Sequence, residues 1–362
     1  MKENVRIVQL IDSLDAGGAE RMAVNYANVL SKTIAFSGLI TSRKEGELKK
    51  ELSENVVYLF AAKEKAIDIS AVQKIRHFIK ENKVDLLHAH GTSFFLAVLI
   101  KLTYPRLKVI WHDHNGNRIK SKSWINRLLS VFSFFFSGVI AVNQDLEGWA
   151  KKHLYTKKIR YFPNFISTKA SVVPPITQLK GEAGRRIIFL ANLRYPKNHI
   201  TFLEAFRISS AIQEGWTLHL IGKDYEDTYS DQIKYFIKKH NLEKIIYLYN
   251  ACPDIEAILQ QGEVGVLSSV YEGFPVTLLE YGKAQLCVLS TNVGYCKAVI
   301  DDKKNGLLFN PTDGLMISEA INEVIGDKEK RIFLSKALSE KVEARFSDKT
   351  IIRQYLEWIE FS

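Results

Sequence analysis

VRIVQLI, residues 5–11, is the first of several strand-like runs that alternate with helical stretches along the chain. Each run is almost continuously apolar, as expected where helices cover both faces of a parallel sheet. The alternation of strand and helix is itself typical of α/β folds. The other runs are VDLLHAH (84–90), KVIWHDH (108–114), GVIAVN (138–143), RRIIFLAN (185–192) and TLHLIG (217–222). The sequence therefore predicts two parallel α/β sheets.

A chain of 362 residues is long enough for two domains, each with its own core. Residues 166–184 break the pattern, because STKASVVPPITQLKGEAG is rich in small residues and contains a Pro-Pro pair. We expect an interdomain linker there. The predicted domains are residues 1–165 and 185–345, followed by a C-terminal helix over 346–362.

The cysteines and the apolar segments indicate a cytoplasmic protein. Three cysteines without metal-ligand spacing make a disulfide framework improbable. The N-terminus goes directly into a strand rather than into a secretion signal. The most lipid-like segment, Trp124 to Val142, contains charged and polar residues. We therefore expect a buried helix followed by a strand there, rather than a membrane span.

The net charge of +10 is concentrated in the N-terminal half. Residues 1–165 hold 26 Lys and Arg against 15 Asp and Glu, whereas residues 166–362 hold 24 against 25. A basic surface attracts nucleic acid, acidic lipid head groups or phosphate-linked acceptors, although it also serves solubility alone. The chain has no recognisable nucleic-acid-binding motif, which disfavours the first of these partners.

A Gly-Phe-Pro turn within SSVYEGFPVTLLE, residues 268–280, opens an apolar helix. Pro275 suits a first helical position, so the backbone N–H groups around Gly273, Phe274 and Val276 would face an anion at the helix end. Glu280 lies inside the helix, where a carboxylate repels phosphate but accepts hydrogen bonds from a diol. This combination predicts a nucleotide, with its ribose on Glu280 and its diphosphate at the helix end.

Two further segments offer groups that bind anions. Gly17 and Gly18 lie in DAGGAER (15–21), between the first strand and a helix, where a tight turn would bring the backbone close to a ligand. Arg194 and Lys197 lie in ANLRYPKNH (191–199), after the first strand of the second domain. Their charges could hold the diphosphate of the predicted nucleotide, and no Asp-x-Asp pattern lies at a suitable place to bind a metal for that purpose. An ordinary turn and a solvated basic loop are the plain alternatives.

Four histidines, His88, His90, His112 and His114, lie at the ends of two predicted strands. Ligands bind at the carboxyl ends of parallel strands, so this position favours a functional role. The His-x-His pairs with Asp113 could hold a metal, as in hydrolases. Alternatively, the rings only form hydrogen bonds within the strand ends.

The motifs, in this order, resemble those of the retaining GT-B glycosyltransferases of family four, also called group 1. SSVYEGFPVTLLE matches the Glu-x7-Glu signature of that family, and GGAER matches its glycine loop. The resemblance implies two Rossmann-like domains whose parallel sheets face across a cleft, with the last helix returning to the first domain. It also implies transfer of a sugar from a nucleotide diphosphate sugar, with retention of anomeric configuration and without a metal or other cofactor.

The resemblance assigns roles to residues at matching positions. Lys197 and Arg194 would hold the diphosphate, and Glu280 the ribose. Glu272 would bind the sugar hydroxyls. His114, or His112 as second choice, would point toward the transferring sugar beside the loop at Gly17 and Gly18.

Some positions depart from the family pattern. Asn192 occupies the usual arginine position, so Arg194 would have to replace it. Gln285 and Cys287 stand where glycine and proline are usual, and Ala298 replaces a common glutamate. These departures concern the identity of the sugar more than the type of reaction.

The expected acceptor is a glycan of a cell-surface polysaccharide such as capsule, O-antigen or lipopolysaccharide. It would be presented on a lipid at the cytoplasmic face of the membrane, with the basic N-terminal half in peripheral contact with anionic lipid. Two other reactions fit parts of the sequence: a nucleotide-sugar epimerase of the same fold, and a metal-dependent phosphoesterase that uses the His-x-His pairs.

Overall fold

The computed structural model describes residues 4–15, 17–115, 118, 124–167 and 173–360. The chain divides into two compact units, residues 1–167 with 348–362 and residues 168–347. We call them the N-terminal unit and the C-terminal unit. Helix α13 (Asp348–Glu360) belongs to the N-terminal unit although it follows the C-terminal unit in sequence.

The N-terminal unit is built on a seven-stranded sheet in the order β3-β2-β1-β4-β5-β6-β7. All neighbouring strands are parallel, which confirms the predicted fold class. The strand order reverses between β1 and β4, so the carboxyl ends of these strands form a topological switch point. The strands are β1 (Arg6–Ser13), β2 (Phe36–Lys44), β3 (Val57–Phe60), β4 (Leu86–His90), β5 (Lys108–Asp113), β6 (Gly138–Ala141) and β7 (Ile159–Tyr161).

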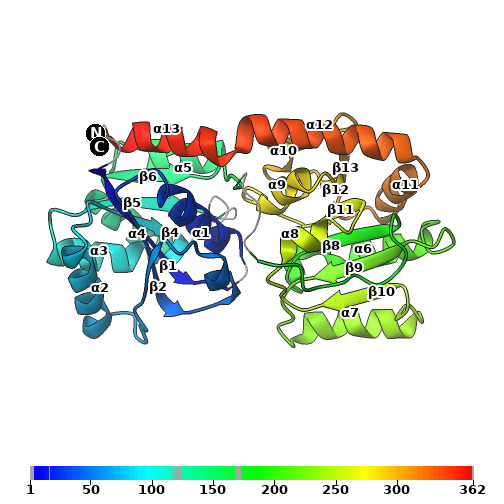
Figure 1. The fold of residues 1–362 in the computed structure, drawn as a ribbon, viewed down its shortest axis with the longest axis horizontal. Coiled ribbons are helices and arrows are strands. Elements are labelled where there is room, and N and C mark those ends of the chain that lie inside the picture. The colour runs from blue at the N-terminus through cyan, green and yellow to red at the C-terminus, as the bar shows by residue number, and fades with distance from the viewer. Residues whose placement is uncertain (1–3, 16, 116–117, 119–123, 168–172, 361–362) are drawn as a thin grey trace. The chain divides into compact units, whose positions relative to one another are not determined.

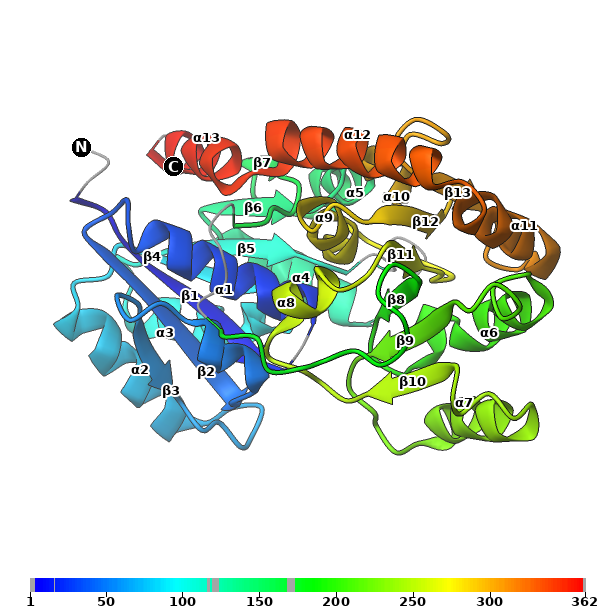
Figure 2. The same cartoon turned by 45° about the vertical axis from the view of Figure 1, so that its right-hand side comes forward.

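Helices cover both faces of this sheet, which explains its continuous apolar strands. On one face Tyr26 of α1 lies against Tyr355 of α13, with ring centroids 5.1 Å apart. On the other face α2 and α3 pack together, as Figures 1 and 2 both show. Besides α13, the described α-helices of this unit are α1 (Gly18–Leu30), α2 (Ile69–Glu81), α3 (Phe94–Thr103), α4 (Trp124–Phe132) and α5 (Gln144–His153).

The segment from Trp124 to Val142 forms a helix followed by a strand, as predicted, but the helix is not buried. Within α4 only Leu129 is fully buried, whereas Trp124 and Val131 are largely exposed. One side of α4 packs on the core and the other side faces solvent. Among the described residues, no helix is both long and apolar enough to cross a bilayer.

The C-terminal unit contains a six-stranded parallel sheet in the order β10-β9-β8-β11-β12-β13. Its switch point lies between β8 and β11. The strands are β8 (Arg186–Leu190), β9 (Thr217–Ile221), β10 (Ile246–Tyr249), β11 (Val264–Leu267), β12 (Cys287–Thr291) and β13 (Leu307–Phe309).

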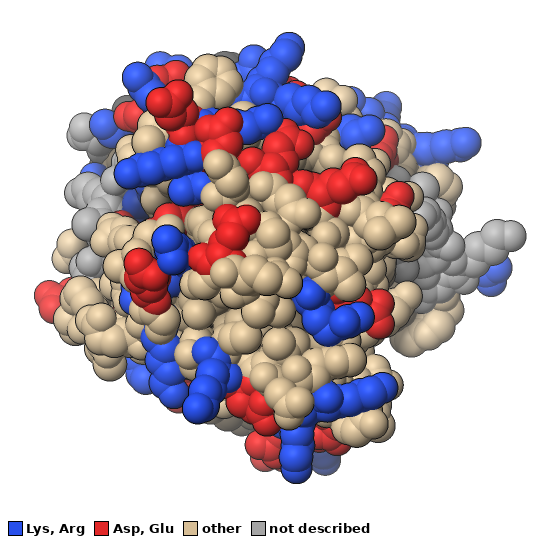
Figure 3. All heavy atoms as spheres, turned by 90° about the vertical axis from the view of Figure 1, so that its right-hand side faces the viewer, with Lys and Arg blue, Asp and Glu red and all other residues tan. Residues whose placement is uncertain are grey.

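Helices α6 and α11 pack together in this unit, and α9 packs on α12. A Cβ atom on Gly282 of α9 would come within 2.6 Å of Val342 of α12, so glycine permits this close approach. Basic and acidic side chains are interspersed over the face in Figure 3, in line with the balanced charge of this half. The helices are α6 (His199–Ile208), α7 (Thr228–Lys239), α8 (Ile255–Leu259), α9 (Val276–Lys283), α10 (Cys296–Val299), α11 (Gly314–Ile325) and α12 (Lys328–Phe346).

Part of the expected linker is fixed to the C-terminal unit. The backbone N–H groups of Ile176 and Thr177 donate to the Asp254 carboxylate at 2.7 and 2.6 Å. Leu179 N–H donates to Gln261 at 2.9 Å. These bonds hold the segment on α8 and the loop after it. Residues 168–172 of the expected linker lie outside the described residues.

Candidate active site

Two charged side chains meet at the switch point of the C-terminal unit. Lys197 follows β8 and Glu272 follows β11, and the Lys197 Nζ atom lies 2.7 Å from Glu272 Oε1. Their side chains are only 19% and 12% exposed. The structure thus joins two residues that the sequence analysis assigned to the diphosphate and to the sugar.

Main-chain contacts hold these two loops together. Ser268 Oγ donates to the carbonyl oxygens of Lys197 and Asn198, at 3.1 and 3.0 Å. Val270 N–H donates to the carbonyl of Pro196 at 3.0 Å. These hydrogen bonds fix the backbone of residues 196–198, and this backbone in turn positions the Lys197 side chain. Ser268 was not predicted as a site residue, although its place at the end of an apolar strand marks it.

Gly294, in the STNVG segment after β12, lies against the backbone of Glu272. Its φ is +53°, and a Cβ atom there would lie 2.0 Å from the carbonyl oxygen of Glu272. Only glycine fits both the left-handed conformation and this approach. The STNVG segment therefore forms a wall beside Glu272.

Asn192, at the usual arginine position of the family pattern, has a structural role here. Its Oδ1 atom accepts a hydrogen bond from the backbone N–H of Lys223 at 2.9 Å, joining the loops after β8 and β9. Arg194 is exposed, and its carbonyl oxygen accepts from Lys197 N–H at 3.0 Å. Arg194 thus lies one 3-10 turn from Lys197.

Helix α9 begins at Val276, so Pro275 is its N-cap rather than its first helical residue. This is a one-residue correction, within the usual uncertainty of helix ends. No side chain caps the helix. Phe274 is buried against Phe346, with ring centroids 5.6 Å apart, so this segment would meet a ligand through its main chain. Glu280 lies about one turn inside the helix and is partly exposed.

Tyr281 fixes α9 on the sheet and was not predicted as a site residue. Its hydroxyl accepts from Leu190 N–H at 2.9 Å and donates to the carbonyl of Val266 at 2.9 Å. Its ring packs on Gly265, where a Cβ atom would come within 2.6 Å. Burial raises the pKa of this phenol. Tyr281 therefore positions the helix that carries Glu280.

The glycine loop of the N-terminal unit differs from the expected tight turn. Gly17 has a φ of −161°, an extended conformation that any residue adopts, and precedes α1 as its N-cap. A Cβ atom on Gly18 would meet nothing within 4 Å. The glycine that the fold requires here is Gly46, because its Cβ atom would come within 2.3 Å of Asp15 N. Gly18 borders open space at the start of α1, whereas a Cβ atom on Gly17 would come within 2.3 Å of the Glu20 carboxylate.

The four histidines form two hydrogen-bonded pairs on β4, β5 and the residue after β5. His88 Nε2 lies 3.2 Å from His112 Nδ1, and His90 Nδ1 lies 3.0 Å from His114 Nε2. His90 Nε2 also lies 2.9 Å from Gln9 Oε1. Hydrogen bonding within the strand ends is therefore what the structure shows for these rings.

Burial keeps these imidazoles neutral. It lowers the pKa of His88 to about 3 and the pKa values of His90 and His112 well below the ordinary value. Nitrogen atoms of His88, His90 and His112 lie within 4.8 Å of one another, so within the described part of the chain these three could hold a metal ion. His114 is the outermost of the four, and it is only partly buried.

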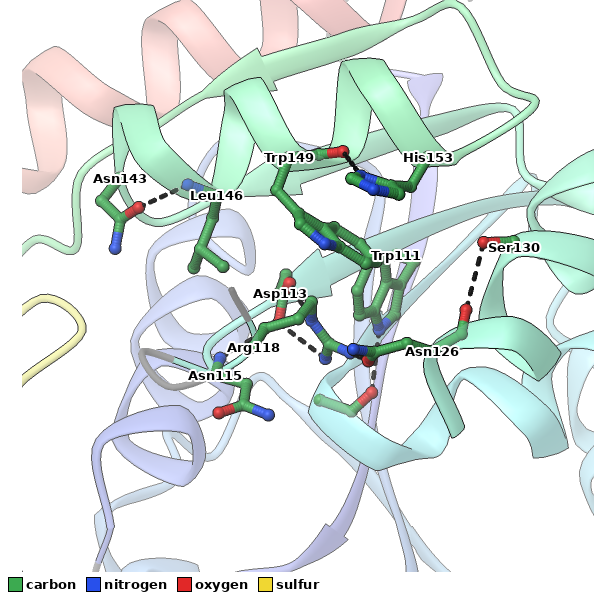
Figure 4. A network of polar contacts seen from close by, with 11 residues as sticks. Trp111, Asp113, Asn115, Arg118, Asn126, Ser130, Asn143, Leu146, Trp149 and His153 are labelled. Carbon is green, nitrogen blue, oxygen red and sulfur yellow. Dashed lines mark hydrogen bonds and ion pairs between the residues drawn. The ribbon is translucent and has the colours of Figure 1, made fainter. Parts of the chain in front are cut away.

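Asp113 is not directed toward the histidines. Arg118 donates to both of its carboxylate oxygens, at 2.5 and 2.9 Å, and to Asn126 Oδ1 at 2.8 Å (Figure 4). The guanidinium carbon of Arg118 lies 5.0 Å from the ring of Trp111 and 5.5 Å from that of Trp149. The carboxylate that a metallohydrolase would need is thus engaged in an ion pair that fixes the start of α4.

Family comparisons cover nearly the whole chain. The family described as "Glycosyl transferases group 1" matches residues 177–340, and "Glycosyltransferase Family 4" matches residues 16–170. The first match contains Lys197, Glu272 and Glu280, and the second contains the glycine loop and the histidines.

Related proteins are similar over most of their length. The GalNAc-alpha-(1->4)-GalNAc-alpha-(1->3)-diNAcBac-PP-undecaprenol alpha-1,4-N-acetyl-D-galactosaminyltransferase of Campylobacter jejuni is 23% identical over 98% of this chain and 97% of that protein. The UDP-Gal:alpha-D-GlcNAc-diphosphoundecaprenol alpha-1,3-galactosyltransferase of Escherichia coli is 22% identical over 76% of this chain and 75% of that protein. The crystal structure of Anabaena HepE with UDP and glucose has a TM-score of 0.82 at 16% identity, covering 99% of this chain and 100% of HepE. That likeness shows the fold.

Proposed function

Because this chain belongs to the group 1 and family 4 glycosyltransferases of GT-B fold, we propose that its C-terminal unit binds the nucleotide diphosphate sugar. We assign the glycan acceptor to the N-terminal unit. The observation that carries the donor assignment is the Lys197–Glu272 pair at the β8–β11 switch point, in the loop that leads into the N-terminus of α9. A switch point is where ligands bind in open α/β sheets.

When the donor binds, the ion pair between the Lys197 ammonium and the Glu272 carboxylate would open, and each group would bind a different part of the donor. Lys197 would turn to the diphosphate, whose negative charge grows as it leaves, together with Arg194 and the main chain of residues 273–276. Glu272 would then accept hydrogen bonds from sugar hydroxyls. Glu280 would bind the two ribose hydroxyls, because a carboxylate is an acceptor only.

The proposed transfer retains the anomeric configuration. Departure of the diphosphate leaves an oxocarbenium-like centre, and the acceptor hydroxyl attacks from the same face. The leaving phosphate itself would take the proton, so no protein base is assigned. His114, as a neutral imidazole, and the loop at Gly17 and Gly18 would shape the face from which the acceptor attacks. Cationic side chains and helix N–H groups would replace a metal ion in neutralising the diphosphate.

The proposed acceptor is a lipid-linked glycan of a cell-surface polysaccharide. The names of the relatives from Campylobacter jejuni and Escherichia coli specify undecaprenol-linked diphosphate acceptors. Such an acceptor lies at a membrane, and the basic excess of residues 1–165 suits peripheral contact with anionic lipid. We place the enzyme at the cytoplasmic face.

Thermal unfolding with a panel of nucleotide sugars tests the donor site. A ligand present at 100 times its Kd stabilises the folded state by about 2.7 kcal/mol. We expect Glu280→Ala to abolish the rise in Tm, whereas Glu319→Ala, at an exposed glutamate of α11, keeps it. An unchanged rise in the Glu280 variant would refute the assignment. Conversion of the donor without an acceptor would indicate an epimerase instead.

A further inference from the structure

The outward side of α4 exposes large apolar side chains. Trp124 and Val131 are 71% and 59% exposed, and Phe134, in the 3-10 turn that follows, is 77% exposed. With Arg127 they occupy positions i, i+3, i+7 and i+10, which fall on one stripe of a helix. Solvent-exposed aromatic side chains in a continuous stripe mark an interaction surface.

The inward side of the same helix is firmly anchored. Leu129 is buried, Phe132 packs on the core of the N-terminal unit, and Asn126 accepts from Arg118. Figure 4 shows Asn126 directed toward Arg118 from this helix. Because the anchored side is fixed, the helix cannot rotate to bury Trp124 and Phe134. Their exposure is a property of the fold.

A further aromatic side chain extends the surface. Tyr155 is 69% exposed, and its backbone N–H donates to Ser133 Oγ at 2.8 Å, next to Phe134. It lies in the chain between the exposed pairs Lys151–Lys152 and Lys157–Arg160. We call Trp124, Arg127, Val131, Phe134 and Tyr155 the α4 surface.

The positive charge around the α4 surface favours an anionic membrane as its partner. Residues 124–144 contain no Asp or Glu. Exposed basic side chains lie within the surface, at Arg127, and around Tyr155, at Lys151, Lys152, Lys157 and Arg160. Trp and Tyr favour the membrane–water interface, and Arg can hold its head group in the polar layer while its stem stays apolar. A two-fold contact between copies would instead bring a basic, acid-free segment onto itself, which like charges disfavour.

We propose that the α4 surface docks on an anionic lipid bilayer. The aromatic side chains enter the boundary between head groups and acyl chains, α4 lies in the plane of the interface, and Arg127 pairs with lipid phosphates. The proposal rests on the proposed function, because it brings the enzyme to the layer that holds a lipid-linked acceptor. It adds the residues that make the contact.

Vesicle co-sedimentation of the full chain tests this surface. We expect binding to vesicles of phosphatidylglycerol with phosphatidylcholine, weak binding to phosphatidylcholine alone, and release by high salt. The double variant Trp124→Ser/Phe134→Ser should bind at least tenfold more weakly. Phe333→Ser is the matched control, because Phe333 on α12 is 63% exposed, and it should bind like the native chain. Arg127→Glu should weaken binding, whereas Arg207→Glu, at an exposed arginine of α6, should not.

Tryptophan emission gives a direct readout. Trp124 is more exposed than Trp111, Trp216 and Trp358, which are buried, so a blue shift on adding anionic vesicles should be lost in Trp124→Phe while binding persists. No vesicle binding, or equal binding by the double variant, would overturn the proposal. So would concentration-dependent dimerisation that the double variant abolishes. Thermal stabilisation by nucleotide sugars should be unchanged in these variants, which separates failure of this proposal from failure of the proposed function.

Discussion

The two units differ in the groups that join the strands at each switch point. At the β8–β11 switch point of the C-terminal unit, Lys197 and Glu272 form a charged pair with little exposure. In the N-terminal unit, Gln9 within β1 and His90 at the end of β4 are paired through neutral atoms, and burial holds the pKa of the imidazole low. At the edge itself the Asp12 carboxylate accepts from the Thr92 hydroxyl. Fold alone therefore does not determine the electrostatics of the site; the residues that follow each strand do.

The two edges also differ in how closely their backbone segments pack. In the C-terminal unit Gly294 touches the backbone of Glu272, so the loops are mutually constrained. In the N-terminal unit Gly18 borders open space. A charged, constrained edge suits a diphosphate sugar, whose position must be fixed. Open space at the start of α1 suits a larger partner.

Removing the cation should have the largest effect. We expect Lys197→Ala to lower kcat/KM for sugar transfer about 100- to 1000-fold, because a group that stabilises developing charge has an effect of that size. Initial rates with a nucleotide sugar and an acceptor measure this. Arg194→Ala, at the exposed cation, should cost less. Equal rates for Lys197→Ala and the native enzyme would mean that the charged edge is not the donor site.

Gly294→Ala should destabilise the constrained edge by at least about 2 kcal/mol, since the left-handed conformation and the contact with Glu272 both oppose a Cβ atom. Chemical denaturation reports the free energy of unfolding. Gly314→Ala is a suitable control, because its Cβ atom would lie in open space. If both variants were equally stable, the close approach would be unimportant.

Acid should destabilise the N-terminal unit more than the C-terminal unit, because burial lowers the pKa of four clustered histidines in the first and of His199 and His219 in the second. A histidine with a lowered folded-state pKa keeps its full stability above the unfolded value of about 6.5, and loses it as the pH falls toward about 3 for His88. Each such group costs up to about 1.4 kcal/mol per pH unit in that window. Hydrogen exchange at about pH 7.5 and about pH 5 should show loss of protection first near β4 and β5.

The exposed His77 provides the control for this acid sensitivity. Its side chain is 73% exposed, so His77→Gln should leave the pH dependence unchanged. Equal protection of β4 at both pH values would contradict the prediction.

Gly18→Ala should have the smallest effect on stability, a gain of no more than about 1 kcal/mol, because alanine is the better helix former and its Cβ atom meets nothing. Thermal unfolding measures the gain. A loss of transfer activity at unchanged stability would indicate that a ligand uses the space beside Gly18. A loss of stability would mean that the loop is more constrained than the structure shows.

Much of the fold could be predicted from sequence because parallel strands buried on both faces are continuous apolar runs. VDLLHAH and TLHLIG, for example, contain β4 and β9 almost completely. The exposure of Trp124, Val131 and Phe134 was not predicted, because the apolar content of the segment indicated burial as a whole, although Asn126, Arg127 and Ser130 fall on one side of the helix. The motif GGAER likewise did not show that Gly17 would be extended as the N-cap of α1.

The sequence by itself determined the fold class, the order of the motifs and the residue types of the site, because these depend on local pattern and chain order. Only the tertiary structure decided which of those residues meet. Lys197 and Glu272 are 75 residues apart in sequence, and the order of β8 and β11 brings them to 2.7 Å. Asp113 stands between two histidines in sequence but pairs with Arg118, because successive side chains of a strand point to opposite faces.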